Sequence, residues 1–162
     1  MKKFLLFLLI ALPILLLAAF FFLNRQEFIC PIAYKGAILV RCDNRGDGFF
    51  AAERKGNRLH EVLDLYAPIG TPVAAVRSGI VAAAKHTRGM GNFVIIRHSG
   101  NITTIYGHLS KIYARKGQFV RQGDIIGEVG KTGNANYRDI QPHLHLEVRK
   151  KGVPQDPLEY LE

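Results

Sequence analysis

The stretch at 142–148, which reads Pro-His-Leu-His-Leu-Glu-Val, has the alternating pattern of a β-strand. Side chains two positions apart on a strand point to the same face. His143 and His145 are therefore expected to project together. A single histidine in a strand is usually a packed or surface residue, but two on one face can act on the same ligand.

Short aliphatic and β-branched runs separated by glycine continue this pattern through most of the chain. We expect strands at 72–76, 79–84, 92–98, 101–106, 118–121, 124–129 and 143–148. Strands at this spacing are typical of an all-β domain. After the N-terminal segment, no stretch shows a helical apolar stripe of ten or more residues, which disfavours α/β nucleotide-binding folds.

The N-terminal segment is apolar and carries no charge from Phe4 to Leu23. About 20 apolar residues suffice to cross a bilayer as a helix. We therefore expect residues 1–23 to be a single transmembrane helix, with Lys2 and Lys3 in the cytoplasm. A cleaved signal peptide is the alternative. Residues 24–45 are then a tether with an edge strand at 37–40, and residues 46–162 form one domain.

The formal net charge of +9 predicts association with anionic material. Because the anchor places the domain outside the cytoplasm, cell-wall polymers and lipid headgroups are the expected anions, and nucleic acid is not. A basic surface that only keeps the protein soluble is the alternative. Cys30 and Cys42 are compatible with one disulfide or with two free thiols. Neither has a cysteine partner at metal-ligand spacing.

Four of the six histidines fall in segments that combine into a metal-site pattern, together with one aspartate. These residues are His60, Asp64, His108, His143 and His145. Catalytic zinc sites use three protein ligands and leave one position open. Two histidines and an aspartate meet that count, and the remaining two histidines are available for proton transfer and for stabilising an oxyanion.

These segments occur in an order that resembles the lysostaphin-type zinc endopeptidases, bacterial enzymes that hydrolyse peptidoglycan peptides. The resemblance runs from about Gly48 to the C-terminus. It rests on Gly-x-Arg-x-His-x-x-x-Asp at 56–64, Ala-Pro-x-Gly-Thr-Pro-Val at 67–73, Gly-x-Val at 79–81, Gly-Asn-x-Val-x-Ile-x-His at 91–98, Tyr-x-His-Leu-Ser at 106–110, the glycine-rich pattern of 120–133, and His-Leu-His-x-Glu-Val at 143–148.

The resemblance implies that His60, Asp64 and His145 bind Zn²⁺ and that His108 and His143 are the catalytic pair. It also implies a fold of packed, mainly antiparallel sheets, of the barrel-sandwich type. The implied activity is hydrolysis of peptide cross-links in peptidoglycan, on the periplasmic or extracellular side of the cytoplasmic membrane. A wall-binding or hydrolase-activating module that retains the zinc site without catalysis is the alternative.

The chain departs from the family pattern at two places. Val62 stands where glycine is usual between the histidine and the aspartate of the first motif. Residues 134–141 make a longer connection before the His-Leu-His segment, and we expect them to form a rim of the substrate groove, with Tyr137 and Arg138 as contacts. A solvated loop with no role in binding is the alternative. Tyr106, two residues before His108, is a further candidate for the groove wall, and a tyrosine packed in a strand is the alternative.

Two rival motifs are weaker. A helical zinc motif starting at His60 would need a helix through Asp64, but Pro68 and Pro72 follow closely with Gly70 between them. Residues 127–132 resemble part of a phosphate-binding loop, but Ile125 stands where that loop requires glycine.

Overall fold

The computed structural model describes residues 11–16, 27–54 and 56–161. Of the expected anchor at 1–23, the described part is 11–16, which is helical, and the rest lies outside the described residues. Among the residues described, we find no helix with the length and apolar character needed to span a bilayer.

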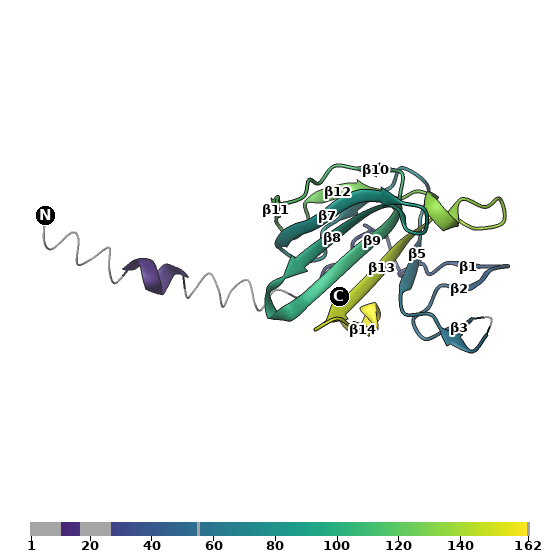
Figure 1. The fold of residues 1–162 in the computed structure, drawn as a ribbon, viewed down its shortest axis with the longest axis horizontal. Coiled ribbons are helices and arrows are strands. Elements are labelled where there is room, and N and C mark those ends of the chain that lie inside the picture. Colours follow the sequence, from purple (N-terminus) through teal and green to yellow (C-terminus); the bar gives the residue numbers. More distant parts are fainter. Residues whose placement is uncertain (1–10, 17–26, 55, 162) are drawn as a thin grey trace, which may run out of the picture.

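Strands joined by antiparallel pairing dominate the described part of the chain (Figure 1). The larger sheet has the order β11-β7-β8-β9-β13-β14, and β5 also pairs with β13. Its strands are β5 (Leu63–Tyr66), β7 (Gly79–Thr87), β8 (Gly91–His98), β9 (Ile102–Leu109), β11 (Phe119–Val120), β13 (His143–Lys150) and β14 (Val153–Gln155). The expected all-β class and antiparallel sheets are thus confirmed.

A second, smaller sheet and two hairpins complete the strands. The smaller sheet has the order β10-β12-β6, formed by β6 (Pro72–Ala74), β10 (Lys111–Ile112) and β12 (Ile125–Glu128). The hairpins pair β1 (Cys42–Asp43) with β2 (Gly46–Asp47), and β3 (Glu53–Arg54) with β4 (Arg58–Leu59). Short 3₁₀ turns follow at η1 (Ser99–Asn101), η2 (Gly133–Ala135) and η3 (Pro157–Glu159).

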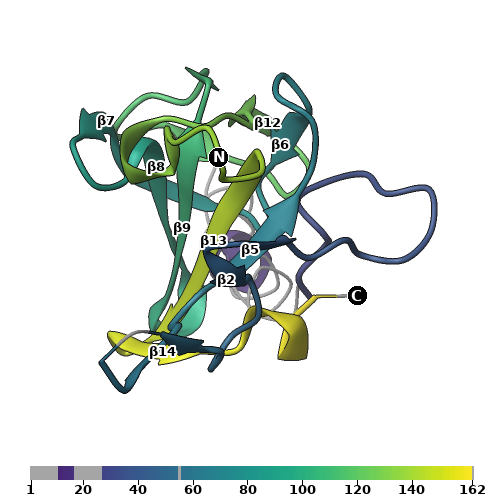
Figure 2. The same cartoon turned by 90° about the vertical axis from the view of Figure 1, so that its right-hand side faces the viewer.

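One apolar core joins the two sheets. Leu144 and Leu146 of β13 are fully buried and belong to the same cluster as Val73 of β6 and Ile126 of β12. The alternation of β13 therefore sends its leucines into the core and leaves His143 and His145 on the opposite face. Figure 2 shows β13 running between β9 and β5, so these histidines lie where the two neighbouring strands can contribute further groups.

Of the segment 24–45, the described residues 27–45 are not a simple tether, which corrects our expectation. Phe28 and Ile32 are buried in the core cluster, and Val40 forms an isolated antiparallel bridge with Leu65. The partners of these residues, such as Leu65, lie far along the chain, so their burial depends on long-range contacts. The globular unit therefore includes residues well before position 46.

The cysteines are two free thiols in the structure, so the disulfide alternative is not realised there. The backbone next to each cysteine is hydrogen-bonded to a different part of the chain. The amide of Ile29 donates to the carbonyl of Val76, whereas the amide of Arg41 donates to the carbonyl of Asp64. The Cys42 thiol instead contacts the Asp47 carboxylate at 3.0 Å.

Candidate active site

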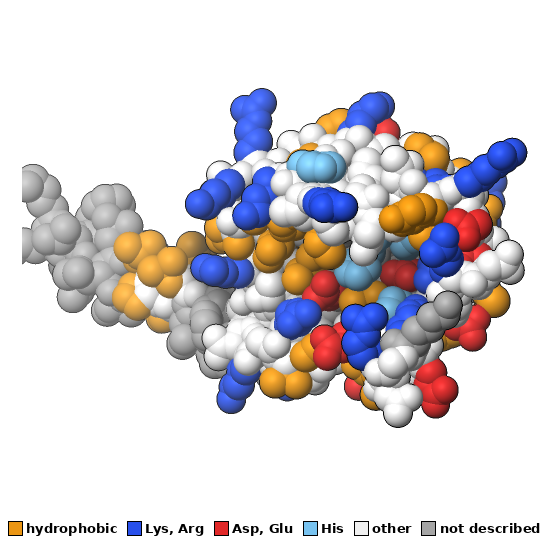
Figure 3. Space-filling view, turned by 45° about the vertical axis from the view of Figure 1, so that its right-hand side comes forward, with side chains coloured by type: hydrophobic (Ala, Val, Ile, Leu, Met, Phe, Trp, Pro, Cys, Tyr) orange, Lys and Arg blue, Asp and Glu red, His pale blue; other side chains and the backbone are white. Residues whose placement is uncertain are grey.

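The fold brings all five predicted site residues to one place. His60 follows β4, Asp64 lies on β5, His108 on β9, and both His143 and His145 on β13. These five side chains line a single pocket of about 280 Å³. Figure 3 shows histidine and acidic side chains at the floor of a hollow with lysine or arginine side chains along its rim. The five residues therefore form one site.

Asp64 is the centre of this cluster. Its Oδ2 lies 3.4 Å from His60 Nε2, and its Oδ1 lies 3.4 Å from His145 Nδ1 and 3.9 Å from His143 Nε2. Strand β5 sets this position because His145 is the register partner of Asp64 across the β5–β13 ladder. Gly48 permits the neighbouring chain to pass closely, since a Cβ there would lie 2.8 Å from the Cβ of Asp64.

His108 reaches the cluster through an irregularity in β9. The pairing of β8 with β9 shifts register between Asn92 and Val94, and His108 has a left-handed backbone with φ of 59°. A bulge of this kind changes which way the following side chains point. Tyr106 and Leu109 can thus both face the core, while the His108 ring lies 5.1 Å from that of His143 and 5.2 Å from that of His145.

Carbonyl groups orient three of the four histidine rings. Nδ1 of His60 lies 2.9 Å from the carbonyl of Phe49, Nδ1 of His108 lies 2.9 Å from that of Thr132, and Nδ1 of His143 lies 2.7 Å from that of Gln141. A carbonyl only accepts, so each Nδ1 carries the proton and each Nε2 keeps a free lone pair.

His145 is oriented from its other side, by a carboxylate. Its Nε2 bonds Glu147 Oε1 at 3.1 Å, which leaves Nδ1 directed at Asp64. Glu147 in turn accepts from Arg149. Partners of this kind typically fix the orientation of metal-binding imidazoles.

The pKa values of the four histidines are shifted in different directions. Burial lowers the pKa of His108 to about 3, reinforced by the charges of His145 and His143. Burial also lowers the pKa values of His143 and His60, despite the opposing charge of Asp64. His108 and His143 are consequently neutral near pH 7 and able to accept a proton.

The carboxylates have the opposite effect on His145. Burial acts to lower the pKa of this residue, but the nearby carboxylates of Asp64 and Glu147 outweigh burial and raise the pKa to about 9. Burial likewise acts to raise the pKa of Asp64, yet the close approach of His145 and the charges of His143 and His60 hold it well below its usual range. Asp64 is therefore ionised, and its surroundings favour positive charge.

Arg41 is a site residue that the sequence analysis missed. Its buried guanidinium donates to Asp64 Oδ2 from Nε at 3.2 Å and from Nη2 at 3.0 Å, and to Asp43 Oδ1 from Nη1 at 2.6 Å. It lies 23 positions before Asp64, outside the segments that carry the family resemblance. An arginine at the end of the apolar run 37–40 is the only local signal.

The residues present suit a zinc ion. Asp64 Oδ1 is buried and has no hydrogen-bond partner in the structure. A buried carboxylate oxygen without a partner is costly, which indicates a cation as its complement. His60 Nε2 lies 3.4 Å from Asp64 Oδ2 and His145 Nδ1 lies 3.4 Å from Oδ1, so imidazole nitrogens and carboxylate oxygens, which zinc takes as ligands, lie close together. Among the described residues, no group of three or more His, Cys, Asp or Glu side chains is close enough together to form a complete metal site.

The expected groove contacts are confirmed only in part. Tyr106 is wholly buried, and its hydroxyl accepts hydrogen bonds from the amide of Val76 and from Thr104, so our expectation that it lines the groove is wrong. The 134–141 segment does form a wall of the pocket, but through Asn134, Ala135 and Ile140. Neither Tyr137 nor Arg138 lines that pocket, although Tyr137 is exposed beside it.

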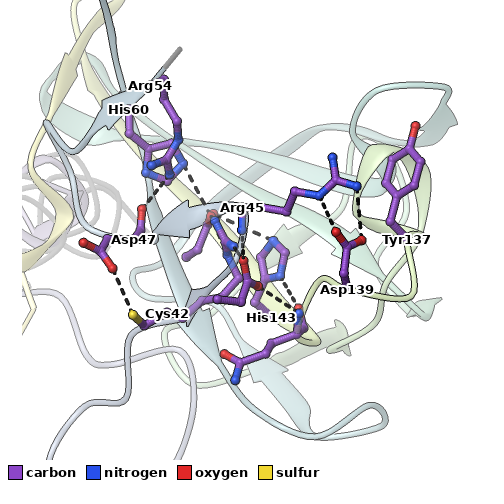
Figure 4. A network of polar contacts seen from close by, with 12 residues as sticks. Cys42, Arg45, Asp47, Arg54, His60, Tyr137, Asp139 and His143 are labelled. Carbon is purple, nitrogen blue, oxygen red and sulfur yellow. Dashed lines mark hydrogen bonds and ion pairs between the residues drawn. The ribbon is translucent and has the colours of Figure 1, made fainter.

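Figure 4 shows how the 134–141 segment is attached to the site. Arg45 forms an ion pair with Asp139 at 2.7 Å and lies 5.2 Å from the centre of the Tyr137 ring. The amide of Gln141 donates to Asp43, the same carboxylate that pairs with Arg41. The loop is therefore linked to both the β1–β2 hairpin and Asp64.

The chain is similar in sequence to known proteins. The chain is 44% identical over 101 residues to the DD-carboxypeptidase/endopeptidase Mpg of Neisseria meningitidis, a match that covers 62% of this chain and 22% of Mpg. The chain thus spans about a fifth of the length of that relative.

Two solved structures have a similar fold. A zinc-containing peptidase from Vibrio cholerae matches with a TM-score of 0.66 and 31% identity, over 81% of this chain and 39% of that one. The catalytic domain of lysostaphin from Staphylococcus simulans matches with a TM-score of 0.61 and 31% identity, over 69% and 87%. The model of peptidase family M23 matches residues 58–157, a span that holds the five clustered residues, and the chain belongs to that family.

Proposed function

We propose that the protein is a zinc-dependent endopeptidase that hydrolyses peptide cross-links of peptidoglycan. The observation that carries this proposal is the partnerless, buried Oδ1 of Asp64, surrounded by histidine nitrogens whose outer sides are already bonded. His60, Asp64 and His145 would hold the ion. A bound zinc would supply Lewis acidity for hydrolysis of a peptide bond.

His108 and His143 have the properties required of the catalytic pair. Both are buried, both present an unprotonated Nε2, and both have lowered pKa values because of burial. One of them can take a proton from the attacking water while the other, when protonated, donates to the developing oxyanion. The carbonyls of Thr132 and Gln141 keep the rings in position throughout.

The bond cut is proposed to be the direct cross-link from D-alanine to a diamino acid. The relative Mpg is named a DD-carboxypeptidase/endopeptidase, which supports this choice over a glycine bridge. We also propose that residues 1–23 anchor the protein in the cytoplasmic membrane by a single pass, with the site on the periplasmic side. The uncharged run from Phe4 to Leu23 supports this, and protease accessibility in spheroplasts tests it.

The test of activity is digestion of purified peptidoglycan by the full-length chain in detergent, with metal analysis of the same sample. About one equivalent of zinc and chelator-sensitive release of cross-linked peptides are expected. Mass analysis of products from walls with direct or glycine-bridged cross-links identifies the bond. Stoichiometric zinc without cleavage of either wall would instead support the non-catalytic, wall-binding or hydrolase-activating module.

A further inference from the structure

The β3–β4 hairpin holds two arginines directly opposite each other. Arg54 and Arg58 are register partners across this two-stranded ladder. Like charges placed opposite each other destabilise an antiparallel pair. A hairpin that keeps such a pair beside a reactive site has a feature that its own stability does not explain.

Neither of these guanidiniums is neutralised by a carboxylate within the described residues. Arg54 donates to the backbone carbonyls of Asp47 at 2.6 Å and of Glu53 at 3.5 Å. The Arg58 guanidinium makes no hydrogen bond or ion pair with any described residue. Arg45 differs, because Asp139 already occupies its guanidinium. Arg54 and Arg58 thus retain donors and charge for a ligand.

The two arginines line a pocket that opens onto the histidines. This pocket has a volume of about 840 Å³, and its walls are Asn44, Arg45, Arg54, Arg58, Leu59, His60 and Glu61. Arg45, Arg54 and His60 also line the pocket that contains Asp64 and the other histidines. Part of a molecule bound at the histidines would therefore lie beside these arginines.

We propose that Arg54 and Arg58 form a binding site for a carboxylate of the substrate peptide, on the His60 side of the cleaved bond. This deepens the proposed function and rests on it. A guanidinium presents a planar fork of donors that fits a carboxylate, and two of them can share its two oxygens. The ligand belongs to the substrate rather than to a separate anion because the two pockets share walls.

The experiment compares two synthetic cross-linked peptides that differ only in a carboxylate or a carboxamide beside the cleaved bond. The wild-type full-length protein should cleave the carboxylate peptide with a KM roughly tenfold lower and a similar kcat, as expected for a charge-assisted hydrogen bond at a solvent-open site. Arg54→Gln and Arg58→Gln should each raise the KM for the carboxylate peptide toward that for the carboxamide peptide. Arg115→Gln, at an exposed position that lines neither pocket, is the matched control and should keep the wild-type preference.

Thermal stability separates binding from a structural role. Because each substitution relieves repulsion across the hairpin, Arg58→Gln should unfold at the wild-type temperature or above it. Equal KM ratios in the wild type and both variants would overturn the proposal, as would a wild type that does not distinguish the peptides. If the wild type cleaves neither peptide, the proposed function fails, and calorimetric binding of the same peptides still decides whether the arginines select the carboxylate.

Discussion

The guanidinium of Arg41 donates two hydrogen bonds to Asp64 Oδ2, whereas Oδ1, which lies near His143 and His145, has no hydrogen-bond partner. Both side chains are nearly inaccessible to solvent, with 6% and 4% of their surface exposed. Asp43 bonds the remaining edge of the guanidinium and balances its charge. Arg41 therefore fixes the orientation of the candidate metal ligand Asp64 through Oδ2 and leaves Oδ1 without a hydrogen-bond partner.

Replacing Arg41 by methionine should destabilise the protein strongly. Removing one partner of a buried ion pair leaves the other charge without compensation and costs about 3 kcal/mol or more. Zinc binding should also weaken, by roughly 10- to 100-fold, because Asp64 loses the group that orients it. Thermal unfolding with a chelator, followed by titration with zinc, measures both effects.

The chain offers a matched control in the exposed pair of Arg45 and Asp139, whose side chains are 51% and 45% accessible. An exposed pair contributes about 0–1 kcal/mol. Arg45→Met should therefore lower the unfolding temperature only slightly. If Arg41→Met were no more destabilising than Arg45→Met, the interpretation of Arg41 as an essential partner of Asp64 would be wrong.

The sequence was most informative where strand periodicity and motif coincide. In β13 the alternation predicted the common face of His143 and His145, which the structure confirms. Strand β5 escaped prediction because it has four residues and is buried on both faces, so it shows no alternation. Its existence depends on pairing with β13, some 80 residues later in the chain.

Other parts of the site depend on contacts that no local pattern reveals. The bulge that directs His108 toward the other histidines is a property of the β8–β9 pairing. Tyr106 was misplaced because the alternation from His108 does not hold across this bulge. Arg41 and the buried Phe28 lie in a segment of mixed composition, where only long-range packing distinguishes a core residue from a tether.

The division between metal ligands and catalytic residues can be tested with three alanine variants. His60→Ala and His145→Ala should abolish zinc binding, because each removes a nitrogen 3.4 Å from Asp64. His143→Ala should retain zinc and lose activity by roughly 100-fold or more, as expected for loss of a general acid or base. Zinc content after dialysis and turnover of a cross-linked peptide are the measurements. Loss of zinc from His143→Ala as complete as that from His145→Ala would contradict the assignment.

Val62 should prove to be a packing residue rather than a change that disables the site. It is buried, and its backbone is not in the left-handed region that would require glycine. Val62→Gly should thus cost roughly 2–4 kcal/mol, from lost burial and greater freedom of the unfolded chain, with zinc retained. Val153→Gly, at a strand position with 60% exposure, should lower the stability only through the greater freedom of the unfolded chain. Increased activity of Val62→Gly without a loss of stability would show that valine impairs the site.

The segment 134–141 should govern access of the intact wall to the site rather than the chemistry. Asn134, Ala135 and Ile140 line the catalytic pocket, and Tyr137 is exposed beside it. The design must spare Gln141, because its carbonyl holds Nδ1 of His143 and its amide bonds Asp43.

Replacing residues 136–139 by a short glycine-containing turn should leave zinc content and the turnover of a small cross-linked peptide unchanged, since no ligand or catalytic histidine is touched. Activity on intact sacculi should fall, because an exposed aromatic ring and the neighbouring Arg138 are suited to gripping a sugar or a peptide carboxylate. Asp139→Asn, which removes only the ion pair to Arg45, is the milder companion variant and should reduce sacculus digestion less. Unchanged rates on both substrates would mean that the loop is solvated and has no part in substrate selection, whereas loss on the small peptide as well would mean that the deletion disturbed His143.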